Sequence, residues 1–351
     1  MLAYLHIPYC DSKCHYCAFN SYVGRFDTRP AYMAALRQQL VQELARFRAG
    51  PHTIETLFIG GGTPSTVSAE LYGPIFELLT PYLVPDAEIT VEANPNSASR
   101  AWLSGMQALG VTRVSFGVQS FNVAKLKILG RAHTARDAVA AIHAAAEAGI
   151  PHRSLDLIYN VRGDTRVLLA ADIEHAMALP IDHLSAYELT LEPGTPFAAD
   201  PDTRRNDDAL AFFVAREITR RGFDQYEVSN FGHYRSRHNL GYWALSPYIG
   251  AGAGAVGYRQ GTRYYPATDI DTYLRDPLNV RIEHLDADAR RTERLFLGWR
   301  SRIGVSAAHL TATMQARADV LVAAGKLTRQ DGRYHNPNLF LADEVTLFVL
   351  G

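Results

Sequence analysis

Short strand-like runs alternate with longer helical patterns along the first two-thirds of the chain, and this alternation constrains the fold more than any other feature. Runs of apolar and β-branched residues predict six strands, at Ala3–Ile7, Glu55–Ile59, Glu88–Glu92, Arg113–Val118, His152–Leu157 and His183–Leu189. Helical periodicity predicts six helices, at Pro30–Phe47, Ala69–Tyr82, Arg100–Leu109, Ala135–Ala148, Thr165–Ala178 and Asp207–Arg221. Because parallel strands need helical crossovers, this order predicts an α/β fold built as a partial (β/α)6 TIM-like barrel.

The remaining third of the chain breaks this pattern. Residues 222–265 are rich in Gly, Tyr, Asn and His, and a loop-rich stretch of this kind in a compact domain is often functional. From about Arg290, two helical patterns precede a hairpin signal at Asp331-Gly332, which together resemble a winged-helix unit. We therefore expect a barrel domain over 1–265, a linker over 266–290 and a small C-terminal domain over 291–351.

Charge and hydropathy exclude several classes of protein. The formal net charge is −1, whereas a broad nucleic-acid footprint needs a strongly basic surface, so we expect no nucleic-acid partner. No apolar run approaches the ~20 residues of a membrane-spanning helix. The first residues read as a strand and not as a secretory signal. These features predict a cytoplasmic protein.

The chain has only three cysteines, and all of them lie in one short segment after the first predicted strand. Cys10, Cys14 and Cys17 follow the pattern C-x3-C-x2-C, and an odd number of thiols argues against a disulfide framework. Three thiolates on a tight loop suit three irons of a cubane cluster and leave the fourth iron open. A zinc site completed by His6 or His15 is the alternative, although zinc ligands usually come in two separated pairs. The pattern closely resembles the radical S-adenosylmethionine (SAM) superfamily, in which SAM binds the open iron.

Glycines and polar residues stand at the ends of four later predicted strands, where βα barrels place functional residues. Gly60–Pro64 follows the second strand; consecutive glycines allow a ligand close to the backbone, and a plain turn is the alternative. Glu92, Gln119 and Asp156 end the next three strands, and Arg131 follows Gln119. Each residue alone could be solvated or salt-bridged, but their shared placement predicts a binding site.

Together these motifs resemble the oxygen-independent coproporphyrinogen III oxidase (HemN-like) family along nearly the whole chain, including the C-terminal unit. The motifs that carry the resemblance are Tyr4-x-His6-Ile7-Pro8, Gly60–Pro64, Glu92–Pro95, Gly117–Ser120 and Asp156–Tyr159. The resemblance implies a [4Fe–4S] cluster on the three cysteines. It also implies SAM contacts at the positions that match the family's motifs, namely Tyr4, Tyr16, Gly61, Gly62, Thr63, Glu92, Gln119, Arg131 and Asp156.

Three features resemble a separate group of this family, the HemW-type haem chaperones, and depart from the oxidases. The oxidases carry a fourth cysteine two residues after the third, where this chain has Phe19. They also carry an N-terminal extension, whereas this chain starts at its first strand. The segment His238–Trp243 matches the H-N-x-x-Y-W motif that this group associates with haem binding. The resemblance therefore implies a haem chaperone without coproporphyrinogen oxidase activity.

By this resemblance His238 is a candidate haem ligand, because a neutral imidazole is a common axial ligand of haem iron. Tyr242 and Trp243 are candidates to cover the face of the porphyrin. Arg235 or Arg237 is a candidate to pair with the haem propionates. A hydrogen-bonded loop histidine beside core aromatics is the alternative. The implied partners are haem and acceptor haemoproteins, soluble or at the membrane, and group members form homodimers. A radical SAM enzyme acting on a tetrapyrrole (an oxidase, a methyltransferase or a haem-degrading relative) is the second hypothesis.

One stretch departs from the family pattern. The family usually continues Asp156–Tyr159 with Gly-Leu-Pro, whereas this chain has Asn160-Val161-Arg162. Asn tolerates the left-handed backbone that Gly usually adopts, so we expect the turn to survive.

Overall fold

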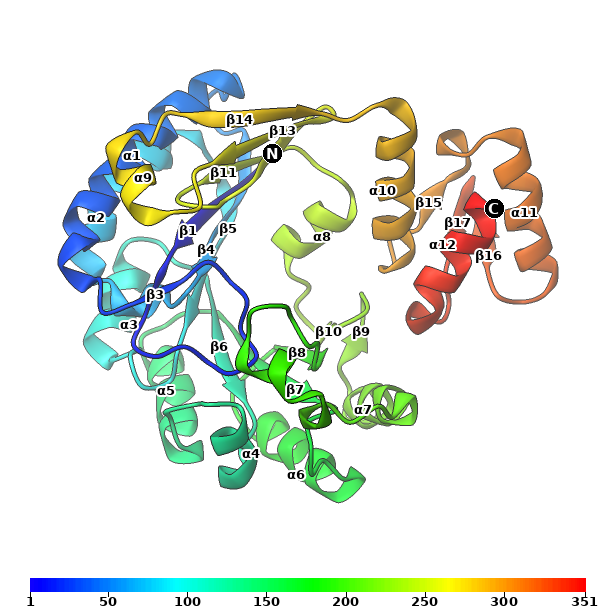
Figure 1. Cartoon of the computed structure of the whole chain (residues 1–351), viewed down its shortest axis with the longest axis horizontal. Coiled ribbons are helices and arrows are strands. Elements are labelled where there is room, and N and C mark those ends of the chain that lie inside the picture. Colours follow the sequence, from blue (N-terminus) through cyan, green and yellow to red (C-terminus); the bar gives the residue numbers. More distant parts are fainter.

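The computed structural model describes residues 1–351 and contains a 12-stranded sheet that curves into a partial ring (Figure 1). Its middle consists of six neighbouring parallel strands: β1 (Leu2–Ile7), β4 (Ile54–Gly61), β5 (Leu83–Ala93), β6 (Arg113–Gln119), β7 (His152–Tyr159) and β8 (His183–Glu188). All six predicted strands are present in the predicted order. The partial (β/α)6 barrel is therefore confirmed.

The helices that connect these strands lie on the outer side of the curved sheet (Figure 1). Six of them match the predicted helices: α1 (Arg29–Arg46), α2 (Ala69–Leu79), α3 (Arg100–Ala108), α5 (Ala135–Glu147), α6 (Arg166–Met177) and α7 (Asp208–Arg220). Thr134 and Asp137 form a capping box at the start of α5, which explains that boundary. The sequence did not predict α4 (Val123–Ile128), because six residues are too few to show helical periodicity.

Each parallel strand presents one face to the helices and the other to the centre of the barrel, because successive side chains alternate. In β5, Ile89 and Val91 join a core of 60 buried residues beneath the helices. Glu88, Thr90 and Glu92 stand at the alternate positions and belong to no apolar cluster. The face of β5 that looks toward the centre of the barrel, called the lumen below, is therefore polar.

Both edges of the parallel sheet are extended by short strands. Next to β1 lies β11 (Tyr248–Ala251), which is also parallel, followed by β12 (Gly257–Arg259), β13 (Thr262–Pro266) and β14 (Val280–His284), each antiparallel to the strand before it. Next to β8 lie β10 (Asn230–Gly232) and then β9 (Asp224–Gln225), each again antiparallel to the strand before it. Between these two groups runs α8 (Arg237–Trp243), which carries the H-N-x-x-Y-W motif. The stretch 266–290, which the sequence suggested as a linker, holds α9 (Ile270–Arg275) and β14, and β14 pairs with β13. The boundaries of the domains themselves stay a prediction.

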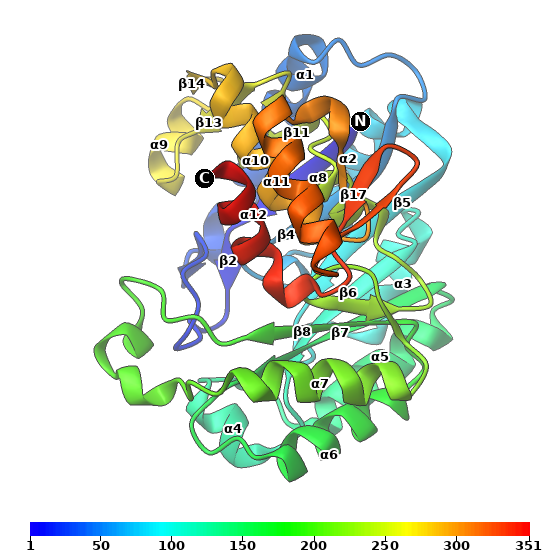
Figure 2. The same cartoon turned by 90° about the vertical axis from the view of Figure 1, so that its right-hand side faces the viewer.

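The C-terminal residues form a compact unit beside the open side of the barrel (Figures 1 and 2). It contains α10 (Ala287–Trp299), α11 (Ala312–Ala323), α12 (Ala342–Leu350) and a small sheet of β15 (Val305–Ser306), β17 (Arg333–His335) and β16 (Thr328–Gln330). The predicted hairpin joins β16 to β17, with Asp331 and Gly332 at φ +49° and +72°, as a type I′ turn requires. Eleven buried residues form a separate apolar core in this unit. No helix in the chain combines the length and apolarity needed to cross a bilayer.

A buried ion cluster fixes the loop that follows β6. Lys125 Nζ lies 2.8 Å from Asp164 and 3.8 Å from Asp172, and all three side chains are buried. Asp172 also accepts hydrogen bonds from Ser120 Oγ at 2.7 Å and from the Phe121 amide at 2.8 Å. Buried charges require such pairing. The cluster therefore ties the β6–α4 loop, which starts next to Gln119, to the loop after β7.

Candidate functional site

The three cysteines lie on the loop after β1, at the end of the barrel where the parallel strands finish. Cys10 ends the short strand β2 (Tyr9–Cys10) and is buried, with its Sγ 3.3 Å from Thr63 Oγ1. Cys14 and Cys17 are half-buried, and Cys14 Sγ accepts a hydrogen bond from Arg131 Nη1 at 3.1 Å. Burial raises the pKa of the Cys10 and Cys17 thiols, and the charge of a neighbouring cysteine raises it further. The loop thus gathers three soft ligands beside one fixed cation.

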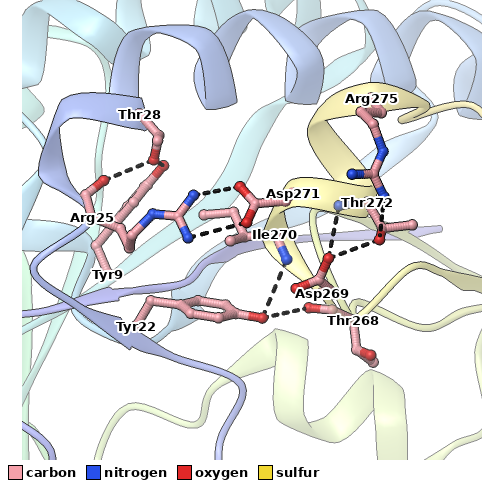
Figure 3. Close-up of polar contacts among 10 residues, drawn as sticks. All are labelled: Tyr9, Tyr22, Arg25, Thr28, Thr268, Asp269, Ile270, Asp271, Thr272 and Arg275. Atoms are coloured by element: carbon pink, nitrogen blue, oxygen red, sulfur yellow. Dashed lines mark hydrogen bonds and ion pairs between the residues drawn. The ribbon is translucent and has the colours of Figure 1, made fainter.

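Contacts from far along the chain hold this loop in place (Figure 3). Tyr22, in β3 (Tyr22–Val23), donates to the Thr268 carbonyl at 3.1 Å and accepts from the Ile270 amide at 3.2 Å. Arg25 forms a two-pronged ion pair with Asp271. The stretch suggested as a linker therefore anchors the cysteine loop, a role that no local pattern in the sequence announced.

The glycines after β4 allow the chain to pack closely against the cysteine segment. A Cβ added at Gly61, whose φ is +114°, would meet the His6 ring at 2.5 Å. A Cβ added at Gly62 would meet the Tyr9 carbonyl oxygen at 2.7 Å. The Gly61 amide donates to Glu92 Oε2 at 3.0 Å. Glycine is therefore needed at both positions, because any side chain would collide with the segment that carries the cysteines. The absence of a side chain lets the end of β4 pack directly against that segment.

A chain of hydrogen bonds links the ends of β4, β5 and β6 to two of the cysteines. Arg131 donates to Asn94 Oδ1 at 2.7 Å and also to the Gly117 carbonyl. Asn94 Nδ2 in turn donates to Thr63 Oγ1, 3.1 Å away, and Thr63 contacts Cys10. Sequence reasoning placed Arg131 and Thr63 here but assigned no role to Asn94. Asn94 joins the two, so we add it to the site.

Two lumen carboxyl groups stand near this network and hold protons more tightly than usual. Burial, and secondly the charge of Asp156, raises the pKa of Glu92 to about 7. Burial likewise raises the pKa of Asp156, which accepts a hydrogen bond from Ser115 Oγ at 3.4 Å. Gln119, at the end of β6, has a left-handed backbone with φ +67° and a buried carbonyl Oε1 without a partner. Strain and unpaired polar atoms of this kind concentrate at binding sites.

The tyrosines and histidines around the cysteines are already engaged within the protein. Tyr4 OH lies 3.0 Å from His6 Nδ1, and His6 Nε2 lies 2.7 Å from the Asn20 carbonyl. His15 Nδ1 pairs with the Ile128 carbonyl at 2.9 Å. Burial raises the pKa of the Tyr16 hydroxyl, and the positive charge of Arg131 offsets only part of this rise. No group of three or more His, Cys, Asp or Glu side chains surrounds a position for a single metal ion. Because both ring nitrogens of His6 are engaged, His6 offers no free lone pair as a fourth ligand for a zinc ion.

His238, in α8, is held inside the barrel with one ring nitrogen free. Thr56 Oγ1 lies 2.7 Å from His238 Nδ1, while the buried Nε2 has no partner. Its ring packs on those of Phe58 and Tyr242 at centroid distances of 5.0 and 4.6 Å. Burial lowers the pKa of His238 to about 3, so the imidazole is neutral at physiological pH. Arg237 is tied to Asp86, and Arg235 is exposed.

The carboxylate of Glu88 fixes the start of α8. It accepts hydrogen bonds from Tyr234 OH at 2.7 Å, from Ser236 Oγ at 3.3 Å, and from the amides of Arg237 and His238 at 2.7 and 3.0 Å. Carboxylates at helix N-termini satisfy amides that have no partner in the helix. Sequence reasoning missed this positioning residue. Its signal is a charged residue in register with Thr90 and Glu92 on the polar face of the strand.

The turn after β7 keeps its shape without the family's glycine. Asn160 has φ +65°, which confirms the expected left-handed backbone. Its side-chain amide donates to Glu188 Oε1 at 3.0 Å. Asn160 therefore replaces the conformational freedom of glycine with a residue that also bonds to the next strand.

Comparison with known proteins agrees with this arrangement. The sequence pattern described as the Radical SAM superfamily matches residues 4–176. A "Heme chaperone HemW" of Mycobacterium tuberculosis is 36% identical, over 99% of this chain and 94% of the relative. The protein of that name in Bacillus subtilis is 34% identical, over 87% of this chain and 84% of the relative. Among solved structures, the Escherichia coli coproporphyrinogen III oxidase HemN superposes with a TM-score of 0.82 over 99% of this chain and 89% of that chain. Its identity of 20% shows a shared fold.

Replacing Glu92 by Gln should change the stability of the protein in a pH-dependent way. With a folded-state pKa near 7, Glu92 binds a proton in the folded chain that the unfolded chain has released above about pH 4.5. The wild type therefore loses stability as pH rises through 7, by up to about 3 kcal/mol for this group. Glu92→Gln has no such loss, so urea unfolding should show its stability rising relative to wild type between pH 5 and pH 8.

The matched control is Glu77→Gln, on the exposed face of α2. Its difference from wild type should be the same at both pH values. A pH-independent difference for Glu92→Gln as well would show that the Glu92 carboxyl is not held in a desolvated place.

Proposed function

The chain belongs to the HemW heme chaperone family of radical SAM proteins, and we propose that it binds haem, a [4Fe–4S] cluster and SAM and delivers haem to haemoproteins. The observation that carries the haem-binding proposal is the buried, neutral His238 with a free Nε2, on the helix that bears the H-N-x-x-Y-W motif. The three cysteines and the polar strand ends support the other two ligands.

Cys10, Cys14 and Cys17 would hold the cluster. When bound, the cluster would supply an iron with an open position for SAM and an electron for its reduction. Arg131 donates to Cys14 Sγ, and a cation there offsets the negative charge that thiolate ligands bring into a half-buried loop. Thr63 plays a similar hydrogen-bonding part at Cys10 Sγ.

SAM would lie over the ends of the strands, against the residues named by the family resemblance. The set that we propose is Tyr4, Tyr16, Gly61, Gly62, Thr63, Glu92, Gln119, Arg131 and Asp156. Glu92 faces the lumen beside the Gly61 amide, where its free lone pairs suit ribose hydroxyls. The unpartnered Gln119 Oε1 supplies an acceptor for a donor on the ligand.

Haem would be bound through His238. Ligating histidines usually donate their other ring N–H to a protein acceptor, and Thr56 Oγ1 occupies that place at Nδ1. The free Nε2 keeps its lone pair because the ring stays neutral far above its pKa of about 3. A buried polar atom without a partner costs about 1–3 kcal/mol, which an iron ligand bond would offset.

The second hypothesis is a radical SAM enzyme that acts on a tetrapyrrole, and the fold shared with HemN favours it among enzymes. Where those oxidases carry a fourth cysteine, this chain has Phe19, which is 69% exposed. We propose that coproporphyrinogen oxidase activity is absent. We further propose that the chain is cytoplasmic and forms homodimers. Its partners would be acceptor haemoproteins, either soluble or at the membrane.

Replacing Cys14 by Ala should abolish the iron–sulfur absorbance of the anaerobically reconstituted protein, because one iron loses its thiolate. The measurement is the visible spectrum together with the iron and sulfide content. Ser12→Ala, at an exposed position of the same loop, is the control and should keep a full cluster. Full cluster content in the Cys14 variant would rule out the cysteine assignment.

The proposed function is tested by two assays on one reconstituted sample. Titration with haem should give a stoichiometric haem-bound absorption band, and coproporphyrinogen III supplied with SAM and reductant should stay unconverted. His238→Ala should weaken haem binding by about tenfold or more, because iron loses its protein ligand. Added imidazole should restore the band by entering the vacated space.

His233→Ala is the control, since His233 is an exposed histidine five positions upstream. It should bind haem like the wild type. If wild type forms protoporphyrinogen and binds haem weakly, the chain is an enzyme and not a chaperone. If His238→Ala binds haem as wild type does, His238 is not the haem ligand.

A further inference from the structure

A pocket of about 470 Å³ opens between the barrel and helix α10 of the C-terminal unit. Its walls are mostly aromatic and aliphatic, and they include Tyr4, Tyr242, Tyr248, Tyr258, Phe296 and Leu297. The size and the lining are those of sites for small organic molecules. Tyr4 comes from β1, Tyr242 from α8 and Phe296 from α10, so the pocket exists only where the barrel and the C-terminal unit meet. The aromatic walls suit a flat apolar ring.

A second hollow of about 450 Å³ adjoins the first, and the two share Leu245 and Tyr258. Arg290, Arg291 and Arg294 of α10 line it. Arg291 pairs with Asp288, but neither Arg290 nor Arg294 forms an ion pair with an acidic residue in the structure. Uncompensated arginines beside an apolar pocket favour a ligand with carboxylate groups.

The cationic character of this corner extends to its other side. Arg294 also lines a third hollow together with Trp243 and Arg333. Burial lowers the pKa of the adjacent His309, and the positive charges of Arg294 and Arg333 lower it further. Inside the aromatic pocket the situation differs, since Arg263 is neutralised by Glu283 and Glu293. The anionic end of a ligand would therefore point toward α10 and not toward β13.

We propose that haem is held between α8 and α10, with its ring in the aromatic pocket and its propionates on Arg290 and Arg294. This inference rests on the proposed haem-chaperone function and adds that the C-terminal unit contributes to the haem site. It replaces Arg235 and Arg237 as propionate partners. Arg237 is already bound to Asp86 at the far end of α8 from Tyr242, and no pocket described above includes Arg235.

The position of His238 agrees with this placement. Tyr242 lines the pocket, and its ring lies 4.6 Å from that of His238 at an interplanar angle of 80°. His238 itself does not line the pocket. Tyr242 thus contacts both the pocket and His238, and a movement of its ring would bring a ligand in the pocket next to His238. Glu88 holds the start of α8 in place through the amides of Arg237 and His238.

The test compares haem with its dimethyl ester, in which both propionates are neutral, by absorbance titration of the full chain. Wild type should bind haem at least about tenfold more tightly than the ester, because the arginines recognise the carboxylates. The double variant Arg290→Gln, Arg294→Gln should lose that preference while binding the ester as wild type does. Arg136→Gln, on α5 outside the barrel, removes one positive charge elsewhere and should change neither affinity.

The outcomes separate this inference from the proposed function. If wild type and the double variant bind haem equally well, Arg290 and Arg294 do not hold the propionates, and the haem-chaperone proposal is unaffected. Equal affinity of wild type for haem and ester would lead to the same conclusion. Failure of wild type to bind either molecule would overturn both proposals. Thermal unfolding followed by circular dichroism checks that the double variant is folded.

Discussion

The alternation of side chains between the two faces of a parallel strand is the constraint on which this structure depends. In β5 it sends Ile89 and Val91 beneath the helices and turns Glu88 and Glu92 into the lumen. Glu92 then stands beside the backbone of β4 next to the cysteine loop, while Glu88, four residues earlier on the same face of the strand, caps α8. A single strand therefore positions both the proposed SAM site and the proposed haem ligand.

The site combines a hydrogen-bonded frame with polar atoms that have no partner within the protein. Arg131 links Cys14 to Asn94, and the α9 segment fixes the loop through Tyr22, so the cysteines are held by contacts rather than by the loop alone. In contrast, Gln119 Oε1 and His238 Nε2 are buried without partners. Protein interiors rarely accept such atoms, since each costs about 1–3 kcal/mol. Their placement in one lumen supports ligands on both.

The sequence predicted those features that have local signals. The strand and helix order, the cysteine loop after β1 and the left-handed turn at Asn160 all follow from periodicity, spacing or residue type. Contacts between distant residues were not predictable. Glu88 caps a helix 149 positions later, and α9 anchors the cysteine loop from a stretch that looked like a linker. No pattern in one sequence records such pairing, because the fold creates it.

We propose that one barrel holds two separate iron sites, and anomalous diffraction at the iron edge of haem-loaded, reconstituted crystals is the direct test. We expect one cluster of peaks at Cys10, Cys14 and Cys17, and a single separate peak near His238 in the pocket between α8 and α10. A haem iron located away from α8, or iron density only at the cysteines after haem has bound, would contradict this proposal.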